Sequence, residues 1–588
     1  MQNAETVLGV LRERGRRGLP CNELYRQLFN PQIYLLAYGR IYANQGAMTP
    51  GACGETADGM SEAKIGRIIG ALRHERYRFA PVKRIHIPKK NGKMRPLGLP
   101  SWSDKLVGEV IRLLLEAYYE PRFSGRSHGF RSGRGCHTAL TEVAINWTGT
   151  TWFVEGDISD CFGSLDHQVL LSILAEHIRD NRFLRLIKQM LKAGYLEDWA
   201  WNATLSGAPQ GGVLSPILSN IYLDRLDRFV ETVLMPEYTR GKGRKDNPAY
   251  SRLSAAIRRA RLRGDRTTVH ALRKQRRGIP TGDVNDPGYR RLFYTRYADD
   301  HLLGFTGPKH EAEEIRTRLA DFLRDDLKLE LNEDKTLITH ARTQAAKFLG
   351  YEITVQHARS RPTVNGSIGL RVPREVIKEK CGPYLKHGKP EYRAELLNFD
   401  DHKIISSYGA EYRGIAQYYL LAGDVSRLNR LEGVAKTSML KTLAAKHRST
   451  VTKMARKYKA RTATPHGPRT CFEATVERPG RKPLVARFGG IPLIRQKKAV
   501  LTDRQPVPVT RRKELITRLR TGRCELCEQR AAVEVHQVAK LAGLHKPGRP
   551  QPAWAALMIR MRRKTLVVCA PCHHQAIHNR QPTAKPTE

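Results

Sequence analysis

Two adjacent aspartates in the middle of the chain have the side chains and the setting for chemistry on phosphate. Asp299 and Asp300 follow Tyr297-Ala298 between the apolar segments RLFYTR and HLLGFT. Neighbouring residues of a strand point to opposite faces, so two consecutive aspartates fit a tight turn better than a strand interior. At a turn both can approach a metal, and two carboxylates close together are costly unless a cation lies between them. We therefore predict a strand–turn–strand unit over residues 291–306 with a metal site at its turn.

A third acid, Asp157, ends the apolar segment WFVEGD at residues 152–157, which we interpret as a short buried strand. Three such carboxylates can hold paired divalent ions that stabilise the attacking and leaving oxygens of a phosphoryl transfer. Mg²⁺ prefers oxygen ligands and keeps several waters, so few protein ligands suffice. The alternative is an acidic turn that caps a helix.

The C-terminal segment carries a second set of metal ligands. Two Cys-x-x-Cys pairs, Cys524/Cys527 and Cys569/Cys572, have the spacing of a closed tetrahedral zinc site, and in a reducing compartment such pairs favour zinc over a disulfide. His574 and His578 are four residues apart, which is one face of an α-helix. Together with His536 they could hold one catalytic Mg²⁺ or a similar divalent ion. We interpret this segment as a separate metal-stapled module.

The composition indicates the partner of these sites. The chain has 588 residues, with 102 Lys+Arg against 57 Asp+Glu and a formal net charge of +45. Such charge favours nucleic acid, because each phosphate contact releases counterions. The sequence contains no apolar run of about 18 residues, so we predict no transmembrane helix. The first residues lack the apolar core of a secretory signal. Ten cysteines are too sparse for a disulfide scaffold. We expect no membrane partner.

The elements that must position these residues follow from periodicity and turn residues. We predict a hairpin over 84–100, an amphipathic helix over 104–120, one or two helices over 165–192, a helix over 309–327, and mainly helices over 374–460, including a basic helix over 436–460. Residues 240–291 hold sixteen Lys/Arg against four Asp/Glu. They are either a solvated insertion loop or a surface element that contacts phosphates.

Several segments together resemble those of group II intron-encoded proteins, which combine a reverse transcriptase and maturase with a C-terminal HNH endonuclease domain. They occur in family order over nearly the whole chain: IHIPKKNGKMRPLGLPSWSDKLV, EPRFSGRSHGFRSGRGCHTAL, WFVEGDISDCFGSLDH, SGAPQGGVLSPILSNIYLDRLD, RYADD, LNEDKTLI and KFLGYEI. The resemblance implies an α+β chain with the fingers and palm of a right-hand polymerase, a helical thumb, a basic linker and a small zinc-bound HNH (ββα-metal) module. Its expected domains are an N-terminal extension over 1–80, fingers and palm over 81–360 with the insertion 240–291, a thumb or maturase domain X over 361–480, a DNA-binding linker over 481–520 and an HNH-like zinc module over 521–588.

The resemblance also implies roles for individual residues. Asp157, Asp299 and Asp300 would bind two Mg²⁺ ions, while Lys89 and Arg95, with Lys83 a further candidate, would hold the triphosphate of a deoxynucleotide. Phe162 would crowd a ribose 2′-hydroxyl, with an ordinary core phenylalanine as the alternative. Gln210 and Gly211 would lie under the nucleotide and template, and Lys335 would lie near the leaving phosphates, although a surface lysine is the alternative. Gly163 stands where the family often has an aspartate.

The HNH segment departs from the family at one important position. Gln537 replaces the second histidine of the family's Glu-Val-His-His, which acts as the general base, and glutamine cannot take a proton near neutral pH. Cleavage is therefore expected to be weak or absent, because losing a positioned base costs about 10²–10⁴ in rate. The alternatives are an active nuclease and a purely structural DNA-binding zinc module.

The implied function is RNA-directed DNA synthesis combined with assistance to intron splicing. Expected partners are group II intron RNA, target DNA and deoxynucleoside triphosphates, and the expected location is a bacterial cytoplasm or an organelle. The alternatives are a non-enzymatic splicing factor with a vestigial polymerase and a reverse transcriptase of another retroelement.

Overall fold

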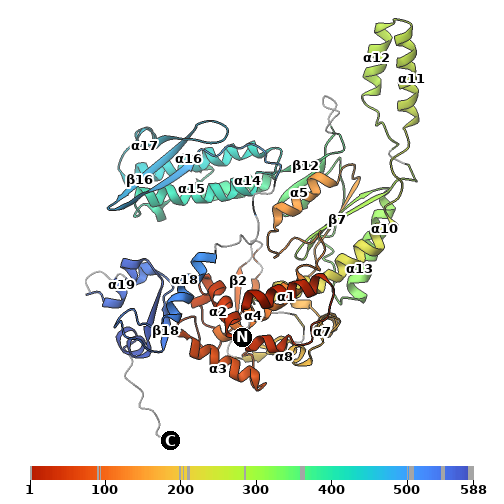
Figure 1. Cartoon of the computed structure of the whole chain (residues 1–588). Coiled ribbons are helices and arrows are strands. Elements are labelled where there is room, and N and C mark those ends of the chain that lie inside the picture. The colour runs from red at the N-terminus through yellow and green to blue at the C-terminus, as the bar shows by residue number, and fades with distance from the viewer. Residues whose placement is uncertain are drawn as a thin grey trace.

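The structure is a computed structural model. It describes residues 3–88, 92, 94–197, 200–202, 204, 206–207, 212–283, 286–357, 365–498, 501, 509–544 and 550–579. In Figure 1 the N-terminal helices and the palm form the body of the molecule, a helical hairpin projects from it, and the helical C-terminal half and the small C-terminal module lie on its other side.

The N-terminal region is a helical layer that packs on one long helix. Asn3 and Asn30 cap the first two helices, and Pro31 occupies the first turn of the second, where its missing N–H costs nothing. Gly15 lets the first helix touch its support, because a Cβ there would lie 2.0 Å from the Tyr118 carbonyl oxygen. The elements are α1 (Ala4–Arg16), η1 (Tyr25–Phe29), α2 (Pro31–Ile41), η2 (Gln45–Met48), β1 (Met60–Ser61), α3 (Glu62–Arg73) and the supporting α4 (Trp102–Tyr119).

The palm is a four-stranded antiparallel sheet in the order β7-β8-β4-β9. Its strands are nearly all buried, as expected for a sheet with helices packed against it. The strands are β4 (Trp152–Gly156), β7 (Arg291–Tyr297), β8 (Asp300–Thr306) and β9 (Ile338–His340). The helical segments around them are α5 (Cys136–Asn146), α6 (Cys161–Ser164), α7 (His167–Ala175), α8 (Asn181–Leu191), α9 (Ser215–Phe229), the π-helical η3 (Val230–Leu234), α10 (Met235–Glu237) and α13 (Lys309–Asp325).

Two smaller sheets flank the palm. One has the order β3-β2-β5-β6 and contains the expected hairpin, with Lys83 of β2 opposite Leu99 of β3. Its strands are β2 (Val82–Pro88), β3 (Met94–Leu99), β5 (Tyr195–Glu197) and β6 (Ala200–Asn202). The other runs in the order β10 (Ala346–Phe348), β11 (Tyr351–Val355) and β12 (Ile368–Arg371).

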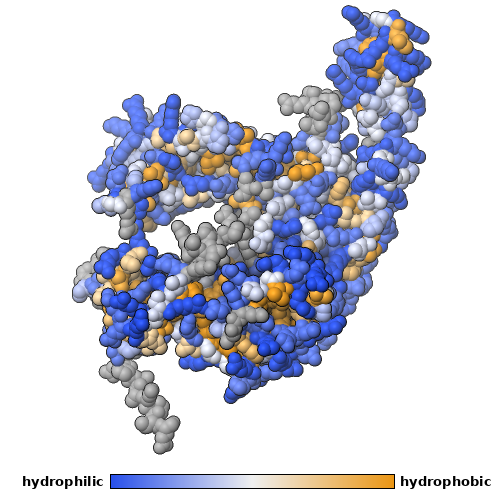
Figure 2. All heavy atoms as spheres, viewed as in Figure 1, coloured by the Kyte–Doolittle hydropathy of each residue, from blue (hydrophilic) through white to orange (hydrophobic). Residues whose placement is uncertain are grey.

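The basic insertion is a helical hairpin and not a loop. Asn247 and Asp265 cap α11 (Pro248–Leu262) and α12 (Arg266–Arg276), and Ile257, Ala260 and Val269 form a small core between them. The hairpin projects away from the body (Figure 1), and hydrophilic side chains cover much of it (Figure 2). Its arginines therefore form a solvated cationic surface.

Residues 374–458, the helical half of the C-terminal region, are mainly helices. A sheet that the sequence analysis did not predict follows them. The basic helix expected over 436–460 is two helices, which separate where Arg448 takes a positive φ of 47°. The helical segments are α14 (Arg374–Cys381), η5 (Gly382–Tyr384), η6 (Ala394–Leu396), α15 (Asp401–Tyr418), η7 (Val425–Leu428), α16 (Asn429–Lys446) and α17 (Val451–Tyr458), and the strands are β13 (Leu385–Lys386), β14 (Lys389–Pro390), β15 (Lys459–Thr462), β16 (Arg469–Arg478) and β17 (Arg481–Gly489).

The domain boundary expected at residue 480 falls inside this sheet. Strands β16 and β17 pair across it, from Arg478 opposite Arg481 to Cys471 opposite Gly489. Strand β17 also packs on α15, because a Cβ at Gly409 would lie 2.1 Å from the Arg487 carbonyl oxygen. Residues 481–489 therefore belong with the helical half in the structure and not with a linker.

The C-terminal module is built on two antiparallel strands, to which the N-terminal region adds a third. In the sheet β1-β18-β19, Met60 and Ser61 of β1 lie opposite Val535 and Glu534 of β18. The module contains α18 (Val509–Arg520), β18 (Val533–Gln537), η8 (Leu541–Leu544), α19 (Ala553–Met561), β19 (Thr565–Cys569) and the π-helical η9 (Cys572–Ile577). No helix in the described ranges is long and apolar enough to cross a membrane.

Candidate metal centres

The two central aspartates lie at a tight turn, as their sequence predicts. Tyr297 at the end of β7 pairs with Asp300 at the start of β8, which leaves Ala298 and Asp299 at the tip. Ala298 takes a positive φ of 56°, a conformation that tight hairpin turns require. Gly129 lies directly against this turn, because a Cβ there would be 2.3 Å from the Ala298 nitrogen. Both carboxylates are therefore held at the end of the palm sheet.

A buried arginine supports the turn from below. Arg296 is fully buried, and its guanidinium donates to Asp227 at 2.6 and 2.7 Å and to the Ala298 carbonyl oxygen at 2.7 Å. Tyr294 donates a further hydrogen bond of 2.8 Å to Asp227. Burial alone would lower the pKa of Arg296, but Asp227 outweighs it and raises that pKa. The turn thus rests on a charged network that is satisfied by hydrogen bonds.

Asp157 approaches the turn from the neighbouring strand. Strand β4 lies beside β8, with Gly156 opposite His301, and a Cβ at Gly156 would lie 2.0 Å from the His301 ring. Glycine at this position therefore lets the end of β4 lie close to the turn. The Asp157 carboxylate lies within hydrogen-bonding reach of Asp300. Asp299 is near enough for the charge of Asp157 to act on it. The three predicted acids therefore converge on one region, but their ligand atoms do not lie within 4.8 Å of one another as those of the cysteine and histidine groups do.

The electrostatics of this group favour a cation. The pKa of Asp300 is raised to about 7, first by burial and then by the negative charges of Asp299 and Asp157. Burial likewise raises the pKa of Asp299. Partly buried carboxylates that repel one another can be neutralised by divalent ions, and oxygen donors are the ligands that Mg²⁺ prefers. The residues present therefore fit magnesium.

Two of the predicted cations also lie at this group. The Lys335 ammonium pairs with Asp157 at 2.5 Å, so Lys335 lies at the carboxylates even though its side chain is 64% exposed. Arg95 on β3 is near enough for its charge to lower the pKa of Asp299, against the larger effect of burial. Lys83 is exposed on β2. Lys89, Gln210 and Gly211 lie outside the described residues.

Phe162 lies on α6, five residues after Asp157, and is half-buried with its ring 6.3 Å from that of Phe130.

Gly163, which stands where the family often has an aspartate, has a steric reason. A Cβ at Gly163 would lie 2.1 Å from a carboxylate oxygen of Asp160. Asp160 itself has a positive φ of 40°. An acid precedes the aromatic residue here, and its side chain fills the space beside residue 163.

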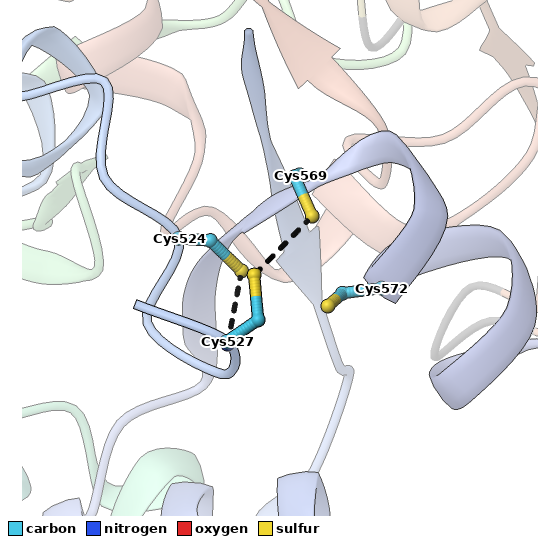
Figure 3. A group of neighbouring side chains, drawn as sticks. All are labelled: Cys524, Cys527, Cys569 and Cys572. Atoms are coloured by element: carbon cyan, nitrogen blue, oxygen red, sulfur yellow. Dashed lines mark hydrogen bonds between the residues drawn. The ribbon is translucent and has the colours of Figure 1, made fainter. Parts of the chain in front are cut away.

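The four C-terminal cysteines form one cluster (Figure 3), and one of them, Cys569, is the last residue of β19. The Sγ atoms of Cys527 and Cys569 are 3.8 Å apart. Zn–S bonds of about 2.3 Å in a tetrahedral site place sulfurs about 3.8 Å apart. Burial would raise the pKa of Cys524, but hydrogen bonds from the backbone N–H groups of Cys527 and Cys569 lower it to about 6. Burial and the neighbouring sulfurs raise the pKa of Cys569 and Cys572. The cluster therefore fits a structural zinc ion.

The histidines form a second cluster, with a different membership from the predicted one. His536, His573 and His578 come together with Asp58 of the N-terminal region. His574 lies outside this group, 52% exposed and 3.6 Å from Glu534, but with Glu534 and His573 it forms a further group of possible metal ligands. The prediction of His574 assumed an α-helix, whereas η9 is π-helical and the N–H of His578 donates to the carbonyl oxygen of His573. That i to i+5 turn aligns residues 573 and 578.

Hydrogen bonds tie the new members of the cluster together. Burial would lower the pKa of His573, but its bonds to Asp58 and Glu534 raise it to about 9. Sequence reasoning missed Asp58, because nothing local marks a single aspartate so far along the chain from its partners. The adjacent histidines His573 and His574 were both visible in the sequence as candidate ligands, but only the type of helix decides which of them faces His578.

Comparisons with known proteins agree with the arrangement of these centres along the chain. Residues 87–353 match the family described as reverse transcriptase (RNA-dependent DNA polymerase), residues 373–475 match type II intron maturase, and residues 524–573 match AI2M/AI1M-like HNH endonuclease. A solved telomerase from Candida albicans aligns with 65% of this chain and 58% of its own at 14% identity, with a TM-score of 0.37, which is too remote to add to the assignment.

Two curated relatives cover nearly the whole chain. The group II intron-encoded protein LtrA of Lactococcus lactis subsp. cremoris is 38% identical over 94% of this chain and 95% of its own length. The COX1/OXI3 intron 1 protein of Saccharomyces cerevisiae is 32% identical over 95% of this chain and 69% of its own. Similarity of this extent, with the same three domains in order, shows that the chain belongs to the group II intron-encoded proteins, reverse transcriptases and maturases that carry a C-terminal HNH domain.

Proposed function

We propose that Asp157, Asp299 and Asp300 hold two Mg²⁺ ions at which this reverse transcriptase joins deoxynucleotides to a primer. The observation that carries the proposal is the convergence of these acids from β4 and the β7–β8 turn, with the pKa of Asp300 raised to about 7 by burial and by the other two. Bound ions would make the primer 3′-hydroxyl more acidic and offset the charge that develops on pyrophosphate.

The residues around the carboxylates position the substrates. Arg95 presents a planar fork that can meet two oxygens of a triphosphate. Lys335 neutralises Asp157 at 2.5 Å while the site is empty of substrate, and its exposed stem lets it turn toward the leaving phosphates when they arrive. Phe162 borders the place of the ribose. Lys83, Lys89, Gln210 and Gly211 keep the nucleotide-binding roles that the resemblance implies.

The remaining domains hold the nucleic acids. The N-terminal extension, the helical half and the basic segment around α18 grip intron RNA and target DNA, and the arginines of the α11–α12 hairpin contact phosphates. This division of labour follows from the net charge of +45 and from the cationic surface of the hairpin. The protein acts in a bacterial cytoplasm or in an organelle, where its intron is transcribed.

The HNH module is proposed as a zinc-stapled DNA-binding unit with impaired cleavage. Its cysteines hold zinc and its histidines hold a second divalent ion. Gln537 donates from its amide to the Tyr42 carbonyl oxygen at 2.7 Å and is nearly buried. A side chain engaged in this way serves docking to the N-terminal region, and it has no basic nitrogen with which to activate water.

Primer extension on an RNA template with Mg²⁺ tests the polymerase assignment. Wild type is expected to extend the primer, and Asp299→Ala is expected to lose at least about a thousandfold, because metal ligation supplies several kcal/mol of transition-state stabilisation. Asp321→Ala, an exposed acid of α13 that pairs with Arg324, is the matched control and should match wild type.

The same assay separates the rival function. A wild type that binds intron RNA and promotes splicing without any extension would leave a non-enzymatic splicing factor. Extension by Asp299→Ala at the wild-type rate would remove the carboxylates from catalysis.

A further inference from the structure

The histidine cluster of the HNH module is completed by a residue from the opposite end of the chain. Asp58 lies two residues before β1, the short strand that adds to the edge of β18. Gly59, with a positive φ of 74°, turns the chain there, and its N–H donates to the Val535 carbonyl oxygen at 3.0 Å. This strand addition delivers the Asp58 carboxylate into the group of histidines.

The donor atoms of the cluster lie close enough together to bind one metal ion. Asp58 Oδ1 lies 3.0 Å from His536 Nδ1 and 3.3 Å from His573 Nε2, and Asp58 Oδ2 lies 2.9 Å from His578 Nε2. His573 Nε2 is in turn 3.3 Å from His536 Nδ1 and 3.2 Å from His578 Nε2. Zn–N bonds of about 2.0–2.1 Å in a tetrahedron place donor atoms about 3.3 Å apart.

The surroundings also resemble those of a metal centre. His536 and His573 are about 5% and 4% exposed at the side chain. Asp58 and His578 are 19% and 32% exposed, so the cluster lies at the edge of the buried interior. The other ring nitrogen of His573 bonds to the Glu534 carboxylate at 2.6 Å. Metal-bound histidines commonly hold a carboxylate in this way, which fixes the ring and its tautomer.

The interface that delivers Asp58 is extensive. Val535 and Val567 of the module and Leu515 and Leu519 of α18 belong to the same buried core as α1, α2 and α4. Arg520 donates to Gln32 on α2 at 2.5 Å. The N–H of Gln537 donates to Asp58 Oδ1 at 2.8 Å. The module is thus packed into the N-terminal region, and Asp58 lies at the inner end of this contact.

The number of protein ligands decides what such a site does. A catalytic metal keeps a coordination position open for water or substrate and has three protein ligands, whereas a structural metal has four. His536, His573 and His578 alone make the open set. With Asp58 the ligand set of a four-coordinate ion such as Zn²⁺ is closed, and a phosphate of DNA has no free position to occupy.

We propose that Asp58 is the fourth ligand of the divalent ion at the HNH histidines, so that the bound ion fastens the module to the N-terminal region and closes the nuclease centre. Opening of the β1–β18 contact would then be needed before DNA reaches the ion. The proposal rests on the proposed metal site of the module and is independent of the polymerase assignment.

Metal titration of the full chain tests this directly. After removal of metals by a chelator, wild type is expected to take up two Zn²⁺ per chain, one at the cysteines and one at the histidines. Co²⁺ distinguishes the two, because thiolate ligands produce charge-transfer absorption and nitrogen and oxygen ligands do not. Asp58→Ala should weaken the thiolate-free site at least tenfold and leave the thiolate site unchanged.

Further variants separate ligation from folding. Asp58→His supplies a metal-binding nitrogen and should keep the second ion within about threefold of wild type, whereas Asp58→Asn, which keeps the shape and an acceptor for Gln537, should not. His573→Ala should lose the second ion and His574→Ala, its neighbour outside the cluster, should keep it. Primer extension by each variant reports that the chain is folded.

Amide hydrogen exchange provides the second readout. Adding Zn²⁺ to metal-free wild type should slow exchange of the Gly59 and Gln537 N–H groups at least tenfold and should not do so in Asp58→Ala. Uptake of one ion only by wild type, full affinity in Asp58→Ala, or exchange that zinc does not alter would each overturn the proposal.

Discussion

The palm and the C-terminal module both gather donors for divalent ions, yet the two sites differ in what surrounds the donors. In the palm, Asp157 and Asp300 come within hydrogen-bonding reach and burial raises the pKa of Asp300 to about 7, so the repulsion between carboxylates exceeds the relief that Lys335 supplies. In the module, three histidines meet an aspartate that satisfies them at 2.9–3.3 Å. The palm carboxylates therefore lack enough positive charge to balance them before an ion binds, whereas the histidine cluster contains its own balancing aspartate.

The two sites also differ in how they are built. The palm aspartates stand on two neighbouring strands and on the buried Arg296–Asp227 pair, all within one domain. The histidine cluster depends on a contact between the first and last parts of the chain. A rigid local frame suits a reaction that requires fixed geometry, whereas a frame shared between domains can be opened.

Removing Arg296 should produce the largest effect, because it attacks the rigid frame. Arg296→Ala leaves the buried Asp227 without its partner and the Ala298 carbonyl without its donor. Loss of one member of a buried ion pair costs about 3–5 kcal/mol. We expect a marked fall in the unfolding midpoint, measured by thermal or chemical denaturation, with primer extension abolished.

Arg324→Ala is the matched control, because this arginine pairs with Asp321 and Asp325 on the exposed face of α13. Its unfolding midpoint should match that of wild type. Equal midpoints for the two variants would contradict the view that the palm turn is held by its buried network.

Restoring the general base tests whether the histidine cluster of the C-terminal module is closed by Asp58. Gln537→His supplies the missing base, but Asp58 still fills the fourth position of a bound Zn²⁺, so nicking of a labelled duplex by the zinc-loaded protein should stay low. Gln537→His combined with Asp58→Ala should nick at least about tenfold faster than Asp58→Ala alone at saturating ion concentration, given that a positioned base contributes about 10²–10⁴. A double variant no faster than Asp58→Ala would refute the impairment by glutamine.

The smallest effect is expected at the α11–α12 hairpin, far from both centres. Replacing Arg258, Arg259 and Arg261 by glutamine should weaken RNA binding a few-fold. It should also reduce the slope of log K against log salt concentration, by about 0.7–0.9 for each phosphate that the hairpin no longer neutralises. A triple replacement on and after α13, at Arg316, Arg324 and Lys328, is the matched control. If only the control replacement reduced the salt dependence of RNA binding, the hairpin arginines would not contact phosphates and would face solvent alone.

The sequence predicted the convergence of the three palm acids, but it did not predict that Asp58 joins the histidine cluster. Asp157, Asp299 and Asp300 could be placed together because short apolar strands and a turn position them locally, and strand pairing does the rest. Asp58 could not, because its role depends on β1 joining β18 across the whole chain. His574 was chosen over His573 because α-helical spacing was assumed where a π-helical turn occurs.

Elsewhere, composition concealed secondary structure. The charge of residues 240–291 drew attention to phosphates, although Asn247-Pro248 and Asp265 are ordinary helix starts. The sheet of β15, β16 and β17 was missed because its strands follow a long helical region and contain many arginines. The domain boundary expected at residue 480 consequently falls between two paired strands.

The pairing of β1 with β18 couples the two ends of the protein in time as well as in space. During synthesis the edge at Met60 and Ser61 leaves the ribosome long before its partner strand exists. The N-terminal helices therefore wait with an unpaired strand and a carboxylate beside it until translation reaches the module. A chain truncated before Val533 would lack β18, so the edge of β1 and the Asp58 carboxylate would stay uncovered.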